Sequence, residues 1–187
     1  MRIYVVRHGE SETNRDQKWT GWFDAPLTDK GRADAQKAAE FLKDISFDKI
    51  YSSDLSRAIE TAKIVVPDCE PELSSLLREI DVGALAGNSN SHLTSEQRYK
   101  IADSGFAEFG GESRAQIKER AKQALKLFET LDCENVGVFT HAGWMSTVLD
   151  VIVGVNIPRG HIKCNNCTVA ICEFTGEKWL LESWINL

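Results

Sequence analysis

The chain has 187 residues, of which 42% are apolar and 27% are charged, and its net charge is −6. This length suffices for one domain with a sizeable core, and the chain lacks the basic excess of proteins that bind nucleic acid. No apolar run approaches the roughly 20 residues that a membrane-spanning helix needs. We therefore expect a soluble, globular protein that binds neither nucleic acid nor membrane.

The chain begins directly with an apolar run, so we expect no signal peptide before it. Its five cysteines are an odd number, and their spacing forms no disulfide framework. This pattern predicts free thiols in a reducing compartment, the cytoplasm.

Strands and helices alternate over the first third of the chain. The apolar run 3–6 predicts a buried strand, and the alanine and leucine spacing in 29–44 predicts a helix with Thr28 as its N-cap. A short strand at 49–52 precedes a second helix, which Pro67 ends. This alternation is typical of a parallel sheet covered by helices.

Two details of this region concern loops and helix ends. Asp54 or Ser56 is the expected N-cap of the second helix. The polar stretch 11–25 is too irregular for a helix and predicts a loop folded over the site. It contains aromatic side chains that either line a substrate pocket or pin the loop to the core. These aromatic residues are Trp19, Trp22 and Phe23.

The pattern loosens over 70–110, which predicts a cap-like insertion that carries substrate choice. Within it we expect a turn-rich piece at 83–91 and a short helix at 94–102. Gly-Gly-Glu-Ser at 110–113 then caps a long amphipathic helix that ends near 131.

The last part of the chain repeats the strand–helix pattern. A buried strand at 136–140 ends in His141 and precedes a helix at 144–153; alternating runs at 168–174 and 179–185 predict a hairpin. The elements together predict one α/β domain over the whole chain, a three-layer sandwich with a mainly parallel central sheet and helices on both faces.

Two of these strands end in histidine followed by small residues, as Arg7-His8-Gly9 and as His141-Ala142-Gly143. Carboxyl ends of parallel strands can lie side by side at a switch point, and Arg57 opens the helix after the second strand. Arginine offers a planar fork to phosphate oxygens, and neutral imidazole can attack phosphorus. A histidine at a strand end is more often structural, but the joint occurrence favours a phosphate site.

On these motifs, from Arg2 to about Thr168, the chain resembles the histidine phosphatase superfamily, in its phosphoglycerate-mutase-like branch. The resemblance implies an α/β sandwich and a phosphohistidine mechanism that needs neither metal nor another cofactor. The motifs are Arg7-His8-Gly9-Glu10-Ser11 with Asn14, Thr20-Gly21-Trp22 with Asp24, Pro26-Leu27-Thr28, Ser52-Ser53-Asp54-Leu55-x-Arg57, Leu77-Arg78-Glu79, Gly110-Gly111-Glu112-Ser113 and Thr140-His141-Ala142-Gly143.

The resemblance also implies a role for each site residue. His8 is the expected nucleophile, and Arg7, Arg57 and His141 are expected to hold the phosphoryl oxygens. Glu79 is the expected general acid for the leaving alkoxide and then the base that activates water. Further substrate- or phosphate-binding positions are Ser11, Asn14, Thr20, Gly21, Ala142 and Gly143.

Departures from the family pattern bear on the reaction. Segment 83–87 reads Gly-Ala-Leu-Ala-Gly where many phosphatases of the family have Gly-x-Trp-Glu-Gly, which puts the local lid geometry in doubt. Segment 79–82 reads Glu-Ile-Asp-Val where cofactor-dependent mutases have Glu-Arg-His-Tyr, and the chain lacks their long insertion. The stretch 19–22, Trp-Thr-Gly-Trp, is mutase-like.

We therefore favour a phosphatase over a mutase. The expected substrate is a small phosphomonoester, such as a sugar phosphate, phosphoserine or ribazole phosphate, and the protein a monomer or homodimer. A phosphoprotein phosphatase and a non-catalytic protein that binds a phosphorylated ligand are the other readings; the presence of His8 and Glu79 argues against the latter.

The run His161-x-x-Cys164-x-x-Cys167 has the spacing of a metal or redox site. It is a single Cys-x-x-Cys pair, and it leads into a predicted strand, where cysteine commonly fills apolar space. Structural thiols are therefore the favoured interpretation, ahead of redox sensing and of zinc.

Overall fold

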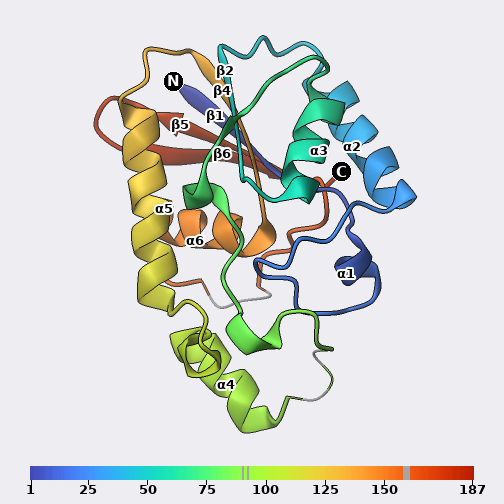
Figure 1. Ribbon diagram of the computed structural model, residues 1–187. Helices are drawn as coiled ribbons and strands as arrows, with labels where there is room; N and C mark the ends of the chain where they lie inside the picture. The colour runs from blue at the N-terminus through green and yellow to red at the C-terminus, as the bar shows by residue number, and fades with distance from the viewer. Residues whose placement is uncertain (90, 92, 158–160) are drawn as a thin grey trace.

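Six strands form one sheet in the order β3-β2-β4-β1-β5-β6 in the computed structural model, which describes residues 1–89, 91, 93–157 and 161–187 (Figure 1). β3, β2, β4 and β1 run parallel, and β5 and β6 close one edge as an antiparallel hairpin. The strands are β1 (Arg2–Arg7), β2 (Lys49–Ser52), β3 (Glu72–Leu73), β4 (Asn135–Thr140), β5 (Val169–Phe174) and β6 (Trp179–Ile185).

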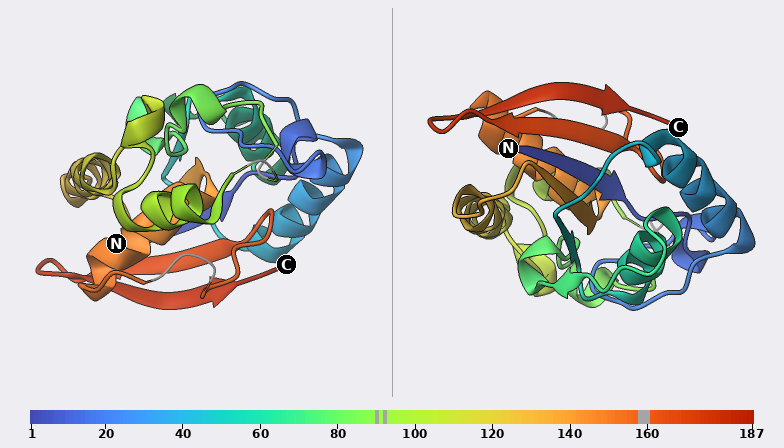
Figure 2. Two further views of the ribbon diagram at one scale, coloured as in Figure 1. Left: turned by 90° about the horizontal axis from the view of Figure 1, so that it is seen from below. Right: turned by 90° about the horizontal axis from the view of Figure 1, so that it is seen from above.

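Helices cover both faces of this sheet, which confirms the predicted three-layer α/β sandwich (Figures 1 and 2). Side chains alternate along β1, so Tyr4 and Val6 join a core with α2 and α3, whereas Ile3 and Val5 join a core with α5 and α6. The covering helices are α2 (Asp29–Leu42), α3 (Ser56–Val65), α5 (Arg114–Glu129) and α6 (Ala142–Val153).

The stretch 11–25 is not entirely irregular, because it contains the one-turn helix α1 (Glu12–Arg15). Ser11 accepts a hydrogen bond from the Asn14 backbone, and the Asn14 side chain accepts one from the Ser11 backbone. This reciprocal capping stabilises a helix too short to show apolar periodicity, which is why the prediction of a plain loop was wrong.

The predicted N-caps of α3 were also wrong. The capping position is Leu55, whose side chain makes no capping hydrogen bond. The Ser56 N–H instead donates to Asp24 Oδ1 over 2.9 Å, and Asp54 forms a two-bond ion pair with Arg78. A carboxylate 32 residues away satisfies this helix end, so the local sequence could not reveal it.

The segment 70–110 begins with the edge strand β3, and its part that contains α4 lies beyond the ends of β1 and β4 (Figure 1). Its described residues include the 3₁₀ turns η1 (Ser75–Leu77), η2 (Gly83–Leu85) and η4 (Ala107–Phe109) and the helix α4 (Ser95–Ser104). The predicted short helix is thus present, although positions 90 and 92 of the predicted insertion lie outside the described residues. Within the described ranges, no helix has the length and apolar character that crossing a membrane requires.

Candidate active site

The carboxyl ends of β1 and β4 bring the two predicted histidines together. Arg7 pairs with Thr140 in the parallel register, and the His8 N–H donates to the Thr140 carbonyl over 2.9 Å. The next residue along each strand is therefore a histidine, and the centres of the His8 and His141 rings lie 5.0 Å apart. Both side chains are buried.

A backbone carbonyl sets the tautomer of His8. Its Nδ1 lies 2.6 Å from the Gly9 oxygen, and a carbonyl can only accept, so Nδ1 carries the proton and the Nε2 lone pair is free. Gly9 must be glycine here, because a Cβ would lie 2.3 Å from the Gly31 carbonyl oxygen.

Two arginines place positive charge around the histidines. Burial, and then the charges of Arg57 and Arg7, lower the pKa of His8 well below 6.5, and burial lowers the pKa of His141 likewise. Burial also lowers the pKa of Arg57 to about 10, so this guanidinium stays charged at neutral pH. The site therefore combines cationic arginines with neutral imidazoles.

Several polar atoms of this cluster have no hydrogen-bond partner among the described residues. They are the Nε atoms of Arg7 and Arg57 and both ring nitrogens of His141. Other guanidinium nitrogens bind backbone: Arg57 donates to the carbonyls of Gly21 and Phe23, and Arg7 to that of Cys164. Buried polar groups are normally paired, so the unpaired ones suit an anionic ligand.

Glu79 reaches this cluster from the 70–110 segment. Thr140 donates to the Leu77 carbonyl over 2.6 Å and so ties the segment to the end of β4. The Glu79 carboxylate accepts hydrogen bonds from the backbone N–H groups of Ile80 and Gly143, at 2.9 and 3.3 Å. A Cβ on Gly143 would lie 2.4 Å from Glu79 Oε1, so only glycine admits the carboxylate this close.

A second set of contacts holds the Glu79 backbone. Its carbonyl accepts from Trp22 Nε1 at 2.7 Å and from Arg120 Nη2 at 3.0 Å. Arg120 also donates to the carbonyls of Leu76 and Arg78 and pairs with Glu112 at 2.7 Å. The carboxylate is thus placed by groups from α5 and from the 11–25 loop.

A cleft of about 270 Å³ opens beside Glu79. Its walls combine apolar side chains with the predicted binding positions. Trp19 lines it and packs edge-on against Phe106, with ring centres 5.3 Å apart, whereas Trp22 positions Glu79 and Phe23 is exposed. The cleft is lined by Asn14, Lys18, Trp19, Thr20, Gly21, Glu79, Ile80, Val82, Phe106, Ala142 and Gly143.

Six of the predicted site residues line this cleft, whereas Ser11 and the cluster of Arg7, His8, Arg57 and His141 are not among its lining residues. The six that line it are Asn14, Thr20, Gly21, Glu79, Ala142 and Gly143. The Ser11 hydroxyl is instead fully buried as the cap of α1, beside the Thr13 hydroxyl at 3.0 Å. In this place it supports Asn14, and its binding of phosphate stays a prediction.

Sequence reasoning missed Asn166 and Arg120. The Asn166 amide donates to the His8 carbonyl and to Asn14 Oδ1, both over 3.1 Å. No local pattern marked it. The Gly-Gly-Glu-Ser run did draw attention to Glu112, and its partner Arg120 lies eight residues later, on the helix that this run precedes.

The cysteines near this site behave as buried apolar residues. All five are free. Burial raises the pKa of Cys164 to about 11 and that of Cys167 to about 12, which disfavours the reactive thiolate. The described part of the chain holds no cluster of three or more side chains suited to a metal ion. Structural thiols remain the favoured interpretation.

Known proteins resemble this chain in sequence and in fold. A model of the histidine phosphatase superfamily (branch 1) matches residues 3–187. The chain is 31% identical to the probable phosphoglycerate mutase GpmB of Photorhabdus laumondii, over 99% of this chain and 90% of that protein.

Two solved structures extend the likeness to the fold. A phosphoserine phosphatase from Entamoeba histolytica, in complex with 3-phosphoglyceric acid, is 28% identical with a TM-score of 0.86, over 100% of this chain and 97% of that one. YhfR of Bacillus stearothermophilus is 26% identical with a TM-score of 0.87, over 97% and 95%.

Proposed function

Because the chain belongs to the histidine phosphatase superfamily, branch 1, we propose that it hydrolyses a small phosphomonoester through a phosphohistidine on His8. The observation that carries this proposal is the 2.6 Å contact between His8 Nδ1 and the Gly9 carbonyl. It leaves the Nε2 lone pair as a nucleophile, beside two arginines that offset the charge of the phosphoryl group.

The first step transfers the phosphoryl group to the protein. His8 Nε2 bonds to phosphorus while the ester P–O bond breaks, and protonated Glu79 gives its proton to the leaving oxygen. Arg7, Arg57 and His141 stabilise the three equatorial oxygens. Bound phosphate dianion favours the protonated form of His141, because a nearby negative charge raises the pKa of an imidazole.

The second step releases phosphate. Glu79, now a carboxylate, takes a proton from water, whose oxygen bonds to phosphorus while the P–Nε2 bond breaks. His8 returns to its neutral form with Nδ1 still held by Gly9. The backbone contacts of Glu79 with Ile80 and Gly143 support this double role, because they hold the carboxylate at one place through both steps.

A mutase-type phosphoryl transfer is the second candidate, and the name of the Photorhabdus relative favours it. The phosphatase proposal is supported by Ile80 and Val82, which make the wall beside Glu79 apolar. A mutase also has to retain its product for a second transfer. Among the residues that line this cleft, Lys18 is the one cation, so the cleft offers a single positive charge for that retention.

The test is hydrolysis by the purified protein with a chelator present. We expect turnover of p-nitrophenyl phosphate and faster turnover of at least one metabolite in a panel of sugar phosphates, phosphoserine, ribazole phosphate and 3-phosphoglycerate. Interconversion of phosphoglycerates that depends on a bisphosphate, with little phosphate release, would assign the mutase reaction instead. Tight phosphate binding without any turnover would assign a binding protein.

The five cysteine thiols bear on where in the cell the protein works. We infer that the protein works in the reducing cytoplasm, since all five cysteines are free. Mass spectrometry of the protein from cells after alkylation should find five modified thiols on denaturation.

A further inference from the structure

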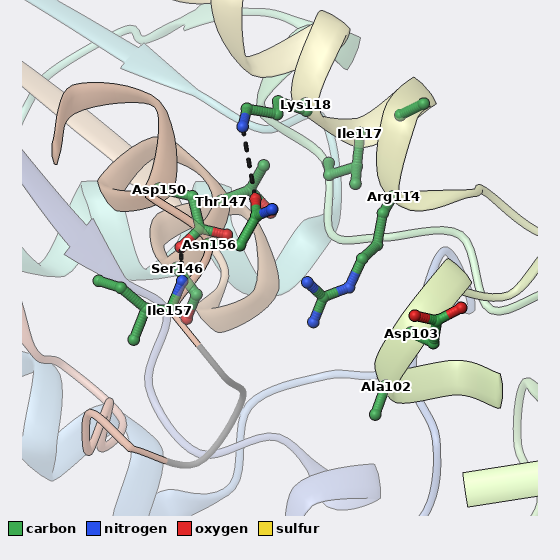
Figure 3. Close-up of a pocket in the computed structure, with 11 residues that line it drawn as sticks. Ala102, Asp103, Arg114, Ile117, Lys118, Ser146, Thr147, Asp150, Asn156 and Ile157 are labelled. Atoms are coloured by element: carbon green, nitrogen blue, oxygen red, sulfur yellow. Dashed lines mark hydrogen bonds between the residues drawn. The ribbon is translucent and has the colours of Figure 1, made fainter. Parts of the chain in front are cut away.

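A second cavity, of about 390 Å³, lies between α4, α5 and α6 (Figure 3). This cavity lies next to the cleft beside Glu79, along the same face of α6. Gly143 lines the cleft, and Thr147 and Asp150 line the cavity. Residues four and seven apart share a helix face, so the cavity begins about one turn beyond the point where Glu79 meets α6.

The opposite wall also borders both hollows. Ala102 of α4 lines the cavity, and Phe106, just beyond the end of α4, lines the cleft. The chain thus passes from cleft to cavity along α6 and from cavity to cleft between residues 102 and 106, so the two hollows are neighbours along both walls. A ligand that lies in the cleft beside Glu79 would extend toward this cavity.

Arg114 is a cation of this cavity that lacks a partner within the described part of the chain, as does the carboxylate of Asp103. The Arg114 Nε is buried and has no hydrogen-bond partner among the described residues. In Figure 3 its guanidinium projects into the space between α4 and α6, and no interaction joins it to Asp103 or to another lining residue. Arg120 on the same helix, in contrast, binds Glu112 and three backbone carbonyls.

A second cation faces the same space. Lys118, one turn after Arg114, contacts Asn156 Oδ1 at 3.4 Å, a long and weak hydrogen bond (Figure 3). Asp103 and Asp150 also line the cavity, and Asp150 accepts from the Ile157 N–H at 2.8 Å. The cavity therefore offers an unpaired guanidinium for an anion together with carboxylates that accept from hydroxyl or ammonium groups.

We propose that this cavity binds the leaving-group end of the substrate and that Arg114 pairs with an anionic group there, a carboxylate or a second phosphate. The inference rests on the proposed hydrolase function of His8. Four to seven residues of α-helix correspond to roughly 6–10 Å. The second anion must therefore stand well away from the scissile phosphate, farther than in a three-carbon phosphate ester.

The experiment compares alkyl phosphates that end in a carboxylate with alkyl phosphates of equal length that end in a methyl group, each with a short and a long chain. We expect the wild-type protein to prefer the long carboxylate ester over its methyl counterpart by roughly tenfold to a hundredfold in kcat/KM, the worth of one charged hydrogen bond. Arg114→Met should abolish that preference, and Arg114→Lys should retain part of it.

Turnover of p-nitrophenyl phosphate should be unchanged in Arg114→Met, because the leaving group of that ester carries no carboxylate or second phosphate for Arg114 to bind. The matched control is Lys122→Met, which removes an exposed cation from the same helix and should keep the preference. Equal turnover of both long esters by the wild type, or a preference that survives Arg114→Met, would overturn the proposal. If that variant fails to fold, Arg114→Lys carries the test, and a preference equal to that of the wild type would then overturn the proposal.

Binding separates this inference from the proposed function. A long carboxyalkyl phosphonate cannot be hydrolysed, and calorimetry should show it binding the wild type at least tenfold more tightly than Arg114→Met. Absence of turnover with p-nitrophenyl phosphate would refute the hydrolase and leave this binding difference standing. Equal binding of the phosphonate by both proteins would refute the cavity assignment alone.

Discussion

Two buried polar clusters meet at Glu79, and they differ in how fully their hydrogen-bonding groups are paired. In the cluster of Arg7, His8, Arg57 and His141, the proposed catalytic cluster, four buried nitrogen atoms have no partner within the described part of the chain. In the supporting cluster, Arg120 makes five hydrogen bonds, to Glu112 and to carbonyls of 76–79.

The difference separates two uses of buried charge. A fully paired cluster stabilises one arrangement of the backbone. Unpaired buried groups instead raise the free energy of the folded protein until a ligand forms hydrogen bonds with them. We therefore expect substitutions in the catalytic cluster to change rates, and substitutions in the supporting cluster to change the free energy of unfolding. The following predictions test that separation.

The largest expected effect is that of His8→Ala. Removal of the nucleophile should lower turnover of p-nitrophenyl phosphate by roughly 10⁴-fold or more and abolish acid-labile labelling of the protein by phosphate. The thermal midpoint should change little. Rates near the wild-type level would contradict a covalent mechanism.

Arg120→Met should act on stability. The Arg120 and Glu112 side chains are only 12% and 14% exposed, and loss of one partner of a buried ion pair costs about 3–5 kcal/mol. Urea unfolding measures this loss of unfolding free energy. The matched control is Lys126→Met, which removes an exposed cation from α5. An unfolding free energy equal to that of the control would show that the supporting cluster does not stabilise the fold.

Glu79→Gln should affect substrates according to their leaving group. An alkyl phosphate releases a basic alkoxide and needs a proton, so its phosphorylation step should slow by roughly 10²-fold or more. Nitrophenyl phosphate releases a stable phenolate, and its burst rate should fall much less. Because dephosphorylation of His8 also uses Glu79, burst kinetics must separate the two steps.

Equal loss of the burst rate for both leaving groups would remove Glu79 from the role of acid. Asp81, two residues later, would then be the next candidate.

The smallest expected effect is a dependence of stability on pH. Burial, followed by nearby positive charge, lowers the pKa of both His8 and His141 well below 6.5. The unfolded chain takes up these protons near pH 6.5 and the folded chain does not. The free energy of unfolding is therefore highest above that pH. It decreases as the pH falls, by up to about 1.4 kcal/mol per pH unit for each histidine.

Urea unfolding of the wild type and of His141→Gln, at about pH 7.5 and about pH 5.5, checks this slope. The variant should lose less stability on acidification than the wild type, because one of the two groups is absent. Carboxylates contribute equally to both proteins. An identical loss would show that His141 is not a neutral buried group.

Local sequence determined the elements whose signals lie within a few residues. The apolar run 3–6 lies in β1, and the helix predicted over 29–44 is α2, which ends two residues earlier, at Leu42. The histidine at the end of each of two parallel strands predicted where the site lies, because parallel strands end at one edge. His8, His141 and Glu79 come together there as the family resemblance implied.

Only the tertiary structure decided the features that depend on distant partners. Asp24 binds the first turn of α3 across 32 residues, and Arg120 reaches the Glu79 carbonyl across 41. The Arg114 cavity likewise needs three helices, so no stretch of sequence marks it. Hydrogen bonds and cavities depend on which surfaces meet in space. The residue pattern within one segment does not identify the distant residues that the segment contacts.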